Sequence, residues 1–173
     1  RVLDFQDAAT VTSTTQGYFF LKSVGDLTTG TPVATTALPG DRLRYTLQFQ
    51  NFTLPALNNI TVTDDFDALN AIAAFVPGTL ALASSNLPAG VTLTVNPTGG
   101  SKGTGSITIG GGATPFNLLQ DEQYQVQFDI TLAASLADGT NVLNQGSLTG
   151  TDVSNVVRSG PSDDPYVGGP ALL

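Results

Sequence analysis

Two segments of this sequence alternate strictly between apolar and polar residues. Residues 42–51 carry an apolar side chain at four alternate positions, and residues 123–132 do so at five. A period of two is typical of a β-strand with one buried and one solvated face, because successive side chains of a strand point to opposite sides. The expected inward residues are Leu43, Tyr45, Leu47 and Phe49 in the first segment and Tyr124, Val126, Phe128, Ile130 and Leu132 in the second.

Shorter stretches with the same alternation predict the remaining strands. They lie at residues 18–24, 60–65, 80–84, 91–95, 107–109 and 142–149. Turn sequences such as LPGD at 38–41 and DGTN at 138–141 separate them. About eight short strands at this spacing predict an all-β fold, an Ig-like antiparallel β-sandwich over residues 17–160.

The two ends of the chain lie outside the alternating segments. We expect residues 1–16 and residues 161–173 to be extended N- and C-terminal arms. Residues 68–75 and 133–136 are the two places where the sequence leaves room for a helical turn or two. Helices this short would not change the fold class.

The composition excludes several kinds of function. The 173 residues include no cysteine and no histidine, which removes disulfides, the usual zinc sites and Ser-His-Asp triads. A net charge of -8 makes nucleic acid an unfavourable partner, and no apolar run is long enough to span a membrane. Charged residues make up only 12%, which together with many Thr, Asn and Gly residues indicates an extracellular or cell-surface protein. We expect no catalytic turnover of an external substrate.

Three polar residues fall on strand faces that are otherwise apolar: Lys22, Asp64 and Asn144. The inward series are Tyr18, Phe20, Lys22 and Val24; Ile60, Val62, Asp64 and Phe66; and Val142, Asn144, Gly146 and Leu148. Burying a lone ammonium or carboxylate costs several kcal/mol unless the charge is paired. We therefore expect the three polar groups to meet in the core.

An apolar pocket that holds these groups would favour a reaction between them. Burial favours the neutral amine of Lys22 and the protonated acid of Asp64. The amine can then attack the carboxamide carbon of Asn144 while Asp64 transfers protons, and ammonia leaves. The resulting amide bond would close a loop of about 120 residues and stabilise the domain much as a disulfide does.

Two other interpretations of the same residues stay open. The three groups can form a buried ion pair whose remaining hydrogen bonds are satisfied by the amide, without any chemistry. Alternatively, the strand register differs from the parity used above, and the Lys22 ammonium reaches water at a strand end.

Five sequence motifs stand in an order found in a known family. They are PGDRLRYTLQFQN (39–51), NITVTDDFD (59–67), LLQDEQYQVQFDITL (118–132), NQGSLTGTDV (144–153) and SDDP (162–165). Together they resemble the bacterial and archaeal surface-repeat family known as domain of unknown function eleven, over about residues 18–165. The resemblance implies an Ig-like extracellular module, similar in plan to the isopeptide-bonded A-type modules of Gram-positive collagen adhesins and pilins. In those modules a first-strand Lys joins a last-strand Asn beside an Asp, and these roles fall on Lys22, Asn144 and Asp64.

Two weaker kinds of site also occur. Candidate calcium ligands are Asp65, Asp67, Asp163 and Asp164, although their spacing is not that of an EF-hand and solvated turns are the alternative. Calcium is the one cofactor that the sequence suggests. The sequons at Asn51 and Asn59 are candidate N-glycosylation acceptors, and Asn59 falls on the solvated face of its strand.

These observations favour a non-enzymatic structural subunit of an extracellular filament or surface fibre, whose partners are copies of itself. Leu3 and Phe5 alternate with polar residues in the N-terminal arm, as in a strand that completes an open sheet edge of the next copy. The alternative is a repeat module of a cell-surface adhesin that binds a host or cell-wall ligand.

Overall fold

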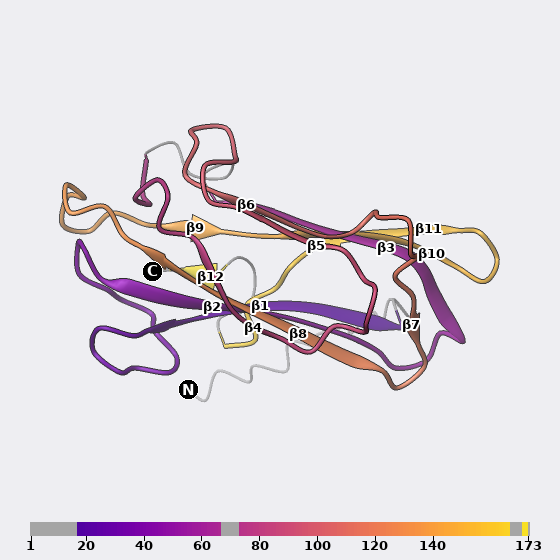
Figure 1. The fold of residues 1–173 in the computed structure, drawn as a ribbon. Coiled ribbons are helices and arrows are strands. Elements are labelled where there is room, and N and C mark those ends of the chain that lie inside the picture. Colours follow the sequence, from indigo (N-terminus) through magenta and orange to yellow (C-terminus); the bar gives the residue numbers. More distant parts are fainter. Residues whose placement is uncertain (1–16, 67–72, 167–170, 173) are drawn as a thin grey trace, which may run out of the picture.

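Two antiparallel sheets packed face to face make up the fold (Figure 1). The computed structural model describes residues 17–66, 73–166 and 171–172, and these residues form twelve β-strands and no helix. The predicted all-β, Ig-like sandwich is confirmed. No helix among the described residues is long and apolar enough to cross a membrane.

The first sheet, called sheet 1, has four strands in the order β1 (Tyr18–Asp26), β2 (Arg42–Asn51), β8 (Gln123–Thr131) and β4 (Ala81–Ser85). The second, sheet 2, has the order β11 (Val157–Pro161), β10 (Ser147–Asp152), β3 (Ala56–Asp65), β6 (Ser106–Gly110) and β5 (Leu93–Asn96), with β7 (Leu118–Leu119) also paired to β3. A separate pair joins β9 (Leu143–Asn144) to β12 (Ala171–Leu172).

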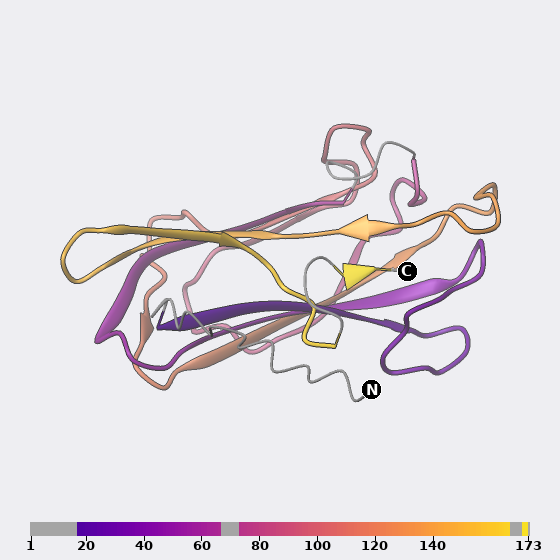
Figure 2. The same ribbon diagram turned by 180° about the vertical axis from the view of Figure 1, so that it is seen from behind.

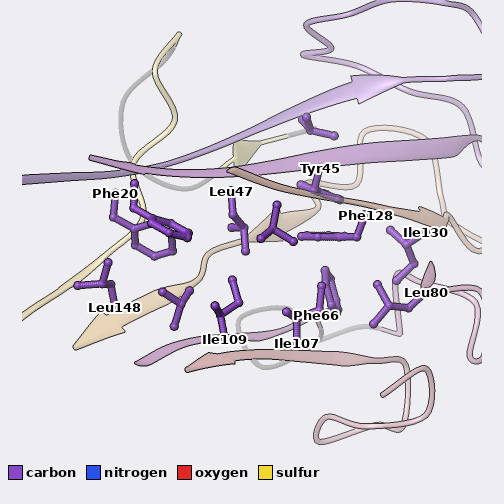
Figure 3. Close-up of a cluster of buried hydrophobic side chains, with 14 of the residues drawn as sticks. Phe20, Tyr45, Leu47, Phe66, Leu80, Ile107, Ile109, Phe128, Ile130 and Leu148 are labelled. Carbon is purple, nitrogen blue, oxygen red and sulfur yellow. The ribbon is translucent and has the colours of Figure 1, made fainter. Parts of the chain in front are cut away.

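The two strictly alternating segments form the centre of sheet 1. β2 and β8 pair in a register that sets Tyr45 opposite Phe128 and Leu47 opposite Val126, so the apolar faces of the two strands coincide. These four side chains are completely buried. Figure 3 shows Tyr45, Leu47 and Phe128 facing Ile107 and other apolar side chains of sheet 2 across the core. Alternation alone is therefore sufficient to place the core of this sheet.

The last predicted strand, at 142–149, is two strands in the structure. The chain leaves β9 after Asn144 and enters β10 at Ser147, and the two strands have different partners. Residues 133–136 form a turn where a helical turn was expected, and of 68–75 only 73–75 are described, without helix. Neither difference changes the fold class.

The predicted C-terminal arm differs from the structure, because part of it packs on the sandwich. Beyond β11 the chain crosses from sheet 2 to the edge of sheet 1, as Figure 2 shows from behind. There the Asp163 N–H donates to the Phe20 carbonyl at 3.0 Å, and the Lys22 N–H donates to the Asp163 carbonyl at 2.8 Å. This pairing satisfies backbone groups that the edge strand β1 would otherwise leave unpaired. The predicted N-terminal arm, residues 1–16, lies outside the described residues.

Candidate cross-linking site

Lys22, Asp64 and Asn144 all lie in the core. Lys22 comes from β1 in sheet 1, Asp64 from β3 in sheet 2 and Asn144 from β9, and each is at most 1% exposed. The inward positions that strand parity predicts for these three side chains match their burial. Side chains from both sheets thus bring an amine, a carboxyl group and a carboxamide into one apolar interior.

The Lys22 amine and the Asp64 carboxylate are in direct contact. Lys22 Nζ donates a hydrogen bond to Asp64 Oδ2, and neither side chain has any solvent-exposed surface. Three aromatic rings surround the same amine, with Nζ at 4.9 Å from the ring centre of Tyr45, 5.3 Å from that of Phe66 and 5.7 Å from that of Phe128. These ring faces and the single carboxylate offset part of the desolvation of the ammonium.

Burial changes the protonation of the amine. Loss of hydration lowers the pKa of Lys22 from 10.5 to about 8, although the Asp64 charge and its hydrogen bond oppose the change. A pKa near 8 leaves about one amine in ten neutral at pH 7, far more than for a solvated lysine. The neutral amine is the nucleophilic form.

Asn144 has an unusual environment for a buried amide. Within the described part of the chain, neither its Nδ2 nor its Oδ1 has a hydrogen-bond partner. The Oδ1 of Asp64 and the hydroxyl of Tyr45 are buried and unpartnered in the same way. Leaving a buried polar group unpaired costs about 1–3 kcal/mol, so four such atoms in a core indicate a site that is not arranged for stability alone.

Tyr45 connects these groups in space. Burial raises the pKa of the Tyr45 hydroxyl, the negative charge of Asp64 raises it further, and an interaction with the side chain of Asn144 lowers it. Both polar neighbours are therefore close to this hydroxyl, and the Lys22 amine lies over the ring of the same residue. The sequence alternation placed Tyr45 in the core but gave no indication that its hydroxyl belongs to the site.

One short segment holds the two ends of the site together. Just beyond Asn144, the Gly146 N–H donates to Ser162 Oγ and the Ser162 N–H donates to the Gly146 carbonyl, both at 2.9 Å. The next residue, Asp163, pairs with the backbone of Lys22. Ser162 is completely buried and was missed in the sequence, because it lies in a region that shows no alternation.

This set of groups can carry out an acyl transfer inside the protein. The amine is a nucleophile, the carboxamide carbon is an electrophile, and the carboxyl group can accept and return a proton. Water is excluded from all three, which favours attack by the amine over hydrolysis.

The three candidate calcium ligands that the structure describes do not form a cluster. Asp163 is exposed while Asp164 is buried and accepts a hydrogen bond from the Tyr166 N–H, because neighbouring side chains of an extended chain point to opposite sides. Asp65 is half-buried on β3, and Asp67 lies outside the described residues. No group of three or more acidic side chains converges in the part of the chain that the structure describes.

The two sequons differ in access. The Asn51 side chain is completely buried and hydrogen-bonds to the backbone of Leu54 and Leu118, so it is not accessible for modification in the folded chain. Asn59 is exposed at an irregular point of β3, where its φ is 52°. Access therefore permits modification at Asn59, which stays a prediction.

Sequence comparison identifies no relative of this chain. No protein-family model matches the sequence, and no curated protein matches it. Membership of the family that the motifs resemble therefore stays a prediction.

Solved structures show what the fold is similar to. The chain is similar to the major pilin subunit BcpA of Bacillus cereus, at 13% identity and a TM-score of 0.53 over 90% of this chain and 39% of that one. It is also similar to the full-length major pilin SpaD of Corynebacterium diphtheriae, at 12% identity and a TM-score of 0.51 over 84% and 33%. An uncharacterized protein of Nocardia farcinica with an immunoglobulin-like fold gives 10% identity and a TM-score of 0.50 over 90% and 96%. The chain thus spans less than half the length of either pilin, and it has an Ig-like β-sandwich fold that occurs in pilin subunits.

Proposed function

We propose that this protein is a structural subunit of an extracellular filament or surface fibre, stiffened by a covalent bond between Lys22 and Asn144. The observation that carries the proposal is the buried Lys22–Asp64 pair beside an unpartnered Asn144 amide. The similarity of the fold to major pilin subunits supports the same role. The protein has no turnover in this role, because its one reaction consumes its own side chains.

The proposed reaction is balanced without any other reagent. A proton passes from Lys22 to Asp64, and the neutral Nζ then attacks Cγ of Asn144. The Nζ–Cγ bond forms and the Cγ–Nδ2 bond breaks, while Asp64 gives its proton to the leaving nitrogen and takes the second proton from Nζ, so that Asp64 ends protonated. The products are an amide bond between the two side chains and one molecule of ammonia.

The bond would join β1 to β9 and close a loop of about 120 residues. A link across a loop of this length stabilises a fold by about 4–5 kcal/mol in the chain-entropy model. The sequence has no cysteine with which to form a disulfide instead. A permanent internal link suits a protein that must stay folded outside the cell.

The mass of the intact protein in denaturant tests this reaction. We expect a deficit of one ammonia relative to the sequence in the wild type, and the full sequence mass in Lys22→Ala, Asp64→Ala and Asn144→Ala. A deficit of one water would instead place the bond between Lys22 and the carboxyl group of Asp64. A wild-type mass equal to that of the sequence would disprove the cross-link.

Assembly by strand addition is the second part of the proposal. The Asp152 N–H donates to the Val156 carbonyl and the Ser162 N–H donates to the Gly146 carbonyl. These two bonds determine which residues of β11 direct their backbone groups toward β10. The backbone N–H and C=O groups of Val157 and Ser159 therefore point away from β10, and they lie at an edge of sheet 2 because β11 is its outermost strand. We propose that this edge accepts the arm containing Leu3 and Phe5 from the next copy.

Polymer formation by the purified full chain tests the assembly. We expect polymers in electron micrographs of the wild type and none from Leu3→Asp/Phe5→Asp. Ser159→Pro should also stop assembly, because it removes an outward N–H and leaves the bonds to β10 intact. A monodisperse wild type that binds a cell-wall or host ligand would favour the adhesin module instead.

A further inference from the structure

The hydroxyl of Tyr45 is a buried polar group that the proposed bond formation does not yet use. The side chain is completely buried, and its oxygen has no hydrogen-bond partner among the described residues. Buried tyrosines usually direct their hydroxyl to a partner, since the apolar ring could otherwise be supplied by phenylalanine. A tyrosine in this position therefore needs a reason.

Aromatic packing fixes the direction of this hydroxyl. The Tyr45 ring stacks on Phe128 at 5.6 Å with an interplanar angle of 21°, and its other neighbours include Phe75 at 6.2 Å and 82°. A ring held from two sides cannot easily turn its oxygen elsewhere in a closely packed core. The packing of the ring therefore fixes the direction of the hydroxyl.

The unpartnered acceptors that accompany it belong to the reacting groups. They are Oδ1 of Asn144 and Oδ1 of Asp64, both buried. Both groups affect the pKa of the Tyr45 hydroxyl, and Lys22 Nζ, which bonds to Asp64, lies 4.9 Å from the centre of the Tyr45 ring, so the hydroxyl belongs to the same cluster as the reacting groups. Burial raises the pKa of the hydroxyl, so the phenol stays protonated and keeps a proton that it can donate in a hydrogen bond.

We propose that the Tyr45 hydroxyl donates a hydrogen bond to Oδ1 of Asn144 and stabilises the negative charge that develops there when Lys22 attacks. The inference rests on the proposed Lys22–Asn144 bond. Attack by the amine on Cγ converts the carbonyl into a tetrahedral centre whose oxygen carries the charge. A fixed donor in a water-free site stabilises that charge without reorganisation. When ammonia leaves, the carbonyl reforms, and the hydroxyl has neither gained nor lost a proton.

The rate of ammonia loss after refolding tests this role. Full-length protein that is purified in denaturant before it has folded, and so has not yet cross-linked, is transferred to native buffer, and the intact mass is followed with time beside the far-ultraviolet circular dichroism signal. We expect Tyr45→Phe to refold like the wild type but to form the bond about 100 to 1,000 times more slowly, as for removal of one oxyanion donor. Tyr124→Phe is the matched control, because this tyrosine packs at the edge of the same core and away from the site, and it should cross-link at the wild-type rate.

A second substitution separates a chemical role from a structural one. A fluorinated tyrosine at position 45 keeps the ring and makes the hydroxyl a stronger donor, so it should speed the reaction above the wild-type rate. Cross-linking of Tyr45→Phe at the wild-type rate, or no response to fluorination, would overturn the role of Tyr45 and leave the bond itself standing. A wild type that never loses ammonia would overturn both proposals.

Discussion

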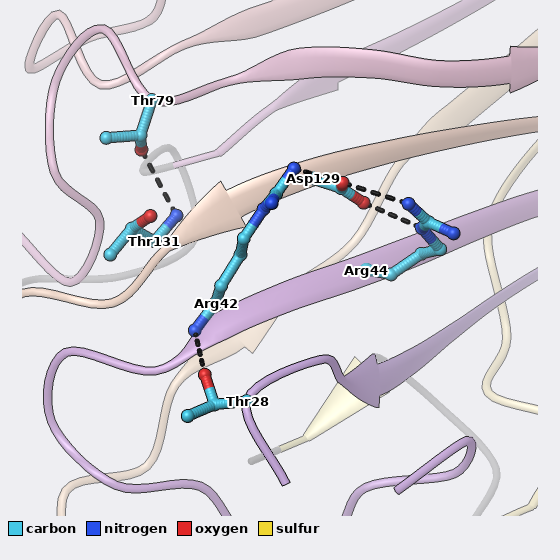
Figure 4. Close-up of polar contacts among 6 residues, drawn as sticks. All are labelled: Thr28, Arg42, Arg44, Thr79, Asp129 and Thr131. Atoms are coloured by element: carbon cyan, nitrogen blue, oxygen red, sulfur yellow. Dashed lines mark hydrogen bonds and ion pairs between the residues drawn. The ribbon is translucent and has the colours of Figure 1, made fainter. Parts of the chain in front are cut away.

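Two cation–carboxylate groups in this protein have opposite environments. On the outer face of sheet 1, Asp129 of β8 accepts hydrogen bonds from Arg42 at 2.8 Å and from Arg44 at 2.7 and 3.0 Å (Figure 4). The arginine side chains are 61% and 38% exposed. In the core, Lys22 and Asp64 pair with no exposed surface, and one carboxylate oxygen has no partner among the described residues.

The difference shows what each group contributes. The outer group has bidentate geometry and keeps its cations hydrated, which is how a surface ion pair gains a little stability at low cost. The core pair gives up hydration and leaves hydrogen bonds unmade, which is costly for stability alone. Burial also moves the pKa of Lys22 down, whereas the hydrogen bond to Asp129 moves the pKa of Arg44 up. The outer group is thus of a kind that stabilises a fold, whereas the core pair has the costly arrangement that the proposed reaction requires.

The largest effect is expected from changes in the core. Asn144→Ala prevents the cross-link but keeps the Lys22–Asp64 pair, and should lower the free energy of unfolding by about 4–5 kcal/mol. Asp64→Ala also leaves the ammonium without its counter-charge, and should cost about 3 kcal/mol more. Unfolding by urea, followed by circular dichroism, measures both.

A matched variant checks the reason for this loss. Lys22→Met/Asp64→Ala removes the ammonium as well, so it should recover most of the difference between Asp64→Ala and Asn144→Ala while staying uncross-linked. Equal stability of the wild type and Asn144→Ala would contradict the cross-link.

An intermediate effect is expected from pH. In Asn144→Ala the free Lys22 amine has a pKa of about 8 when folded and near 10.5 when unfolded, so the unfolded chain binds more protons between these values. Stability should therefore rise by a few kcal/mol as the pH increases from 8 toward 10.5. The titratable groups that face the amine are Asp64 and Tyr45.

The wild type supplies the contrast for this experiment. Its Lys22 nitrogen is an amide in the cross-linked protein and does not titrate. The urea concentration at the midpoint of unfolding should therefore not rise between pH 8 and 10.5. Asn144→Ala/Lys22→Met should lack this rise too. Because the double variant keeps all the tyrosines, the pH dependence that it shows measures their contribution. A rise of the same size in the wild type would mean that its amine is free.

The smallest effect is expected from the outer group. Asp129→Asn should lower the free energy of unfolding by at most about 1 kcal/mol, because Arg42 and Arg44 remain in contact with water. Added salt should reduce the difference between this variant and the wild type further. A loss as large as that of Asp64→Ala would remove the distinction between the two groups.

Alternation of side chains was enough to predict the main strands but not all of them. β2 and β8 follow the pattern over their whole length, so their inward faces could be assigned. β11 contains a glycine and a proline and is mostly exposed, so no apolar face marked it. The break between β9 and β10 depends on tertiary partners, the hydroxyl of Ser162 among them, and such contacts leave no local signal.

The candidate site was predictable in part for the same reason. Lys22, Asp64 and Asn144 stood out because each interrupts an apolar series. Tyr45 continues such a series, so its hydroxyl could be recognised only from the contacts between sheets. The burial of Asn51 was predictable from the sequence, because Asn51 has the same parity as Phe49 on β2. The sequon at Asn51 predicts an accessible side chain, and the parity of the strand predicts a buried one.

Tryptic mapping of the denatured wild type tests the Lys22–Asn144 bond most directly. Trypsin cleaves after the six Lys and Arg residues of the chain, but not after a lysine whose amine is acylated. The proposal predicts a branched product in which fragment 2–42, uncut at Lys22, is joined to fragment 103–158 with the loss of one ammonia. Separate fragments 2–22 and 23–42 beside an unmodified 103–158 would contradict it.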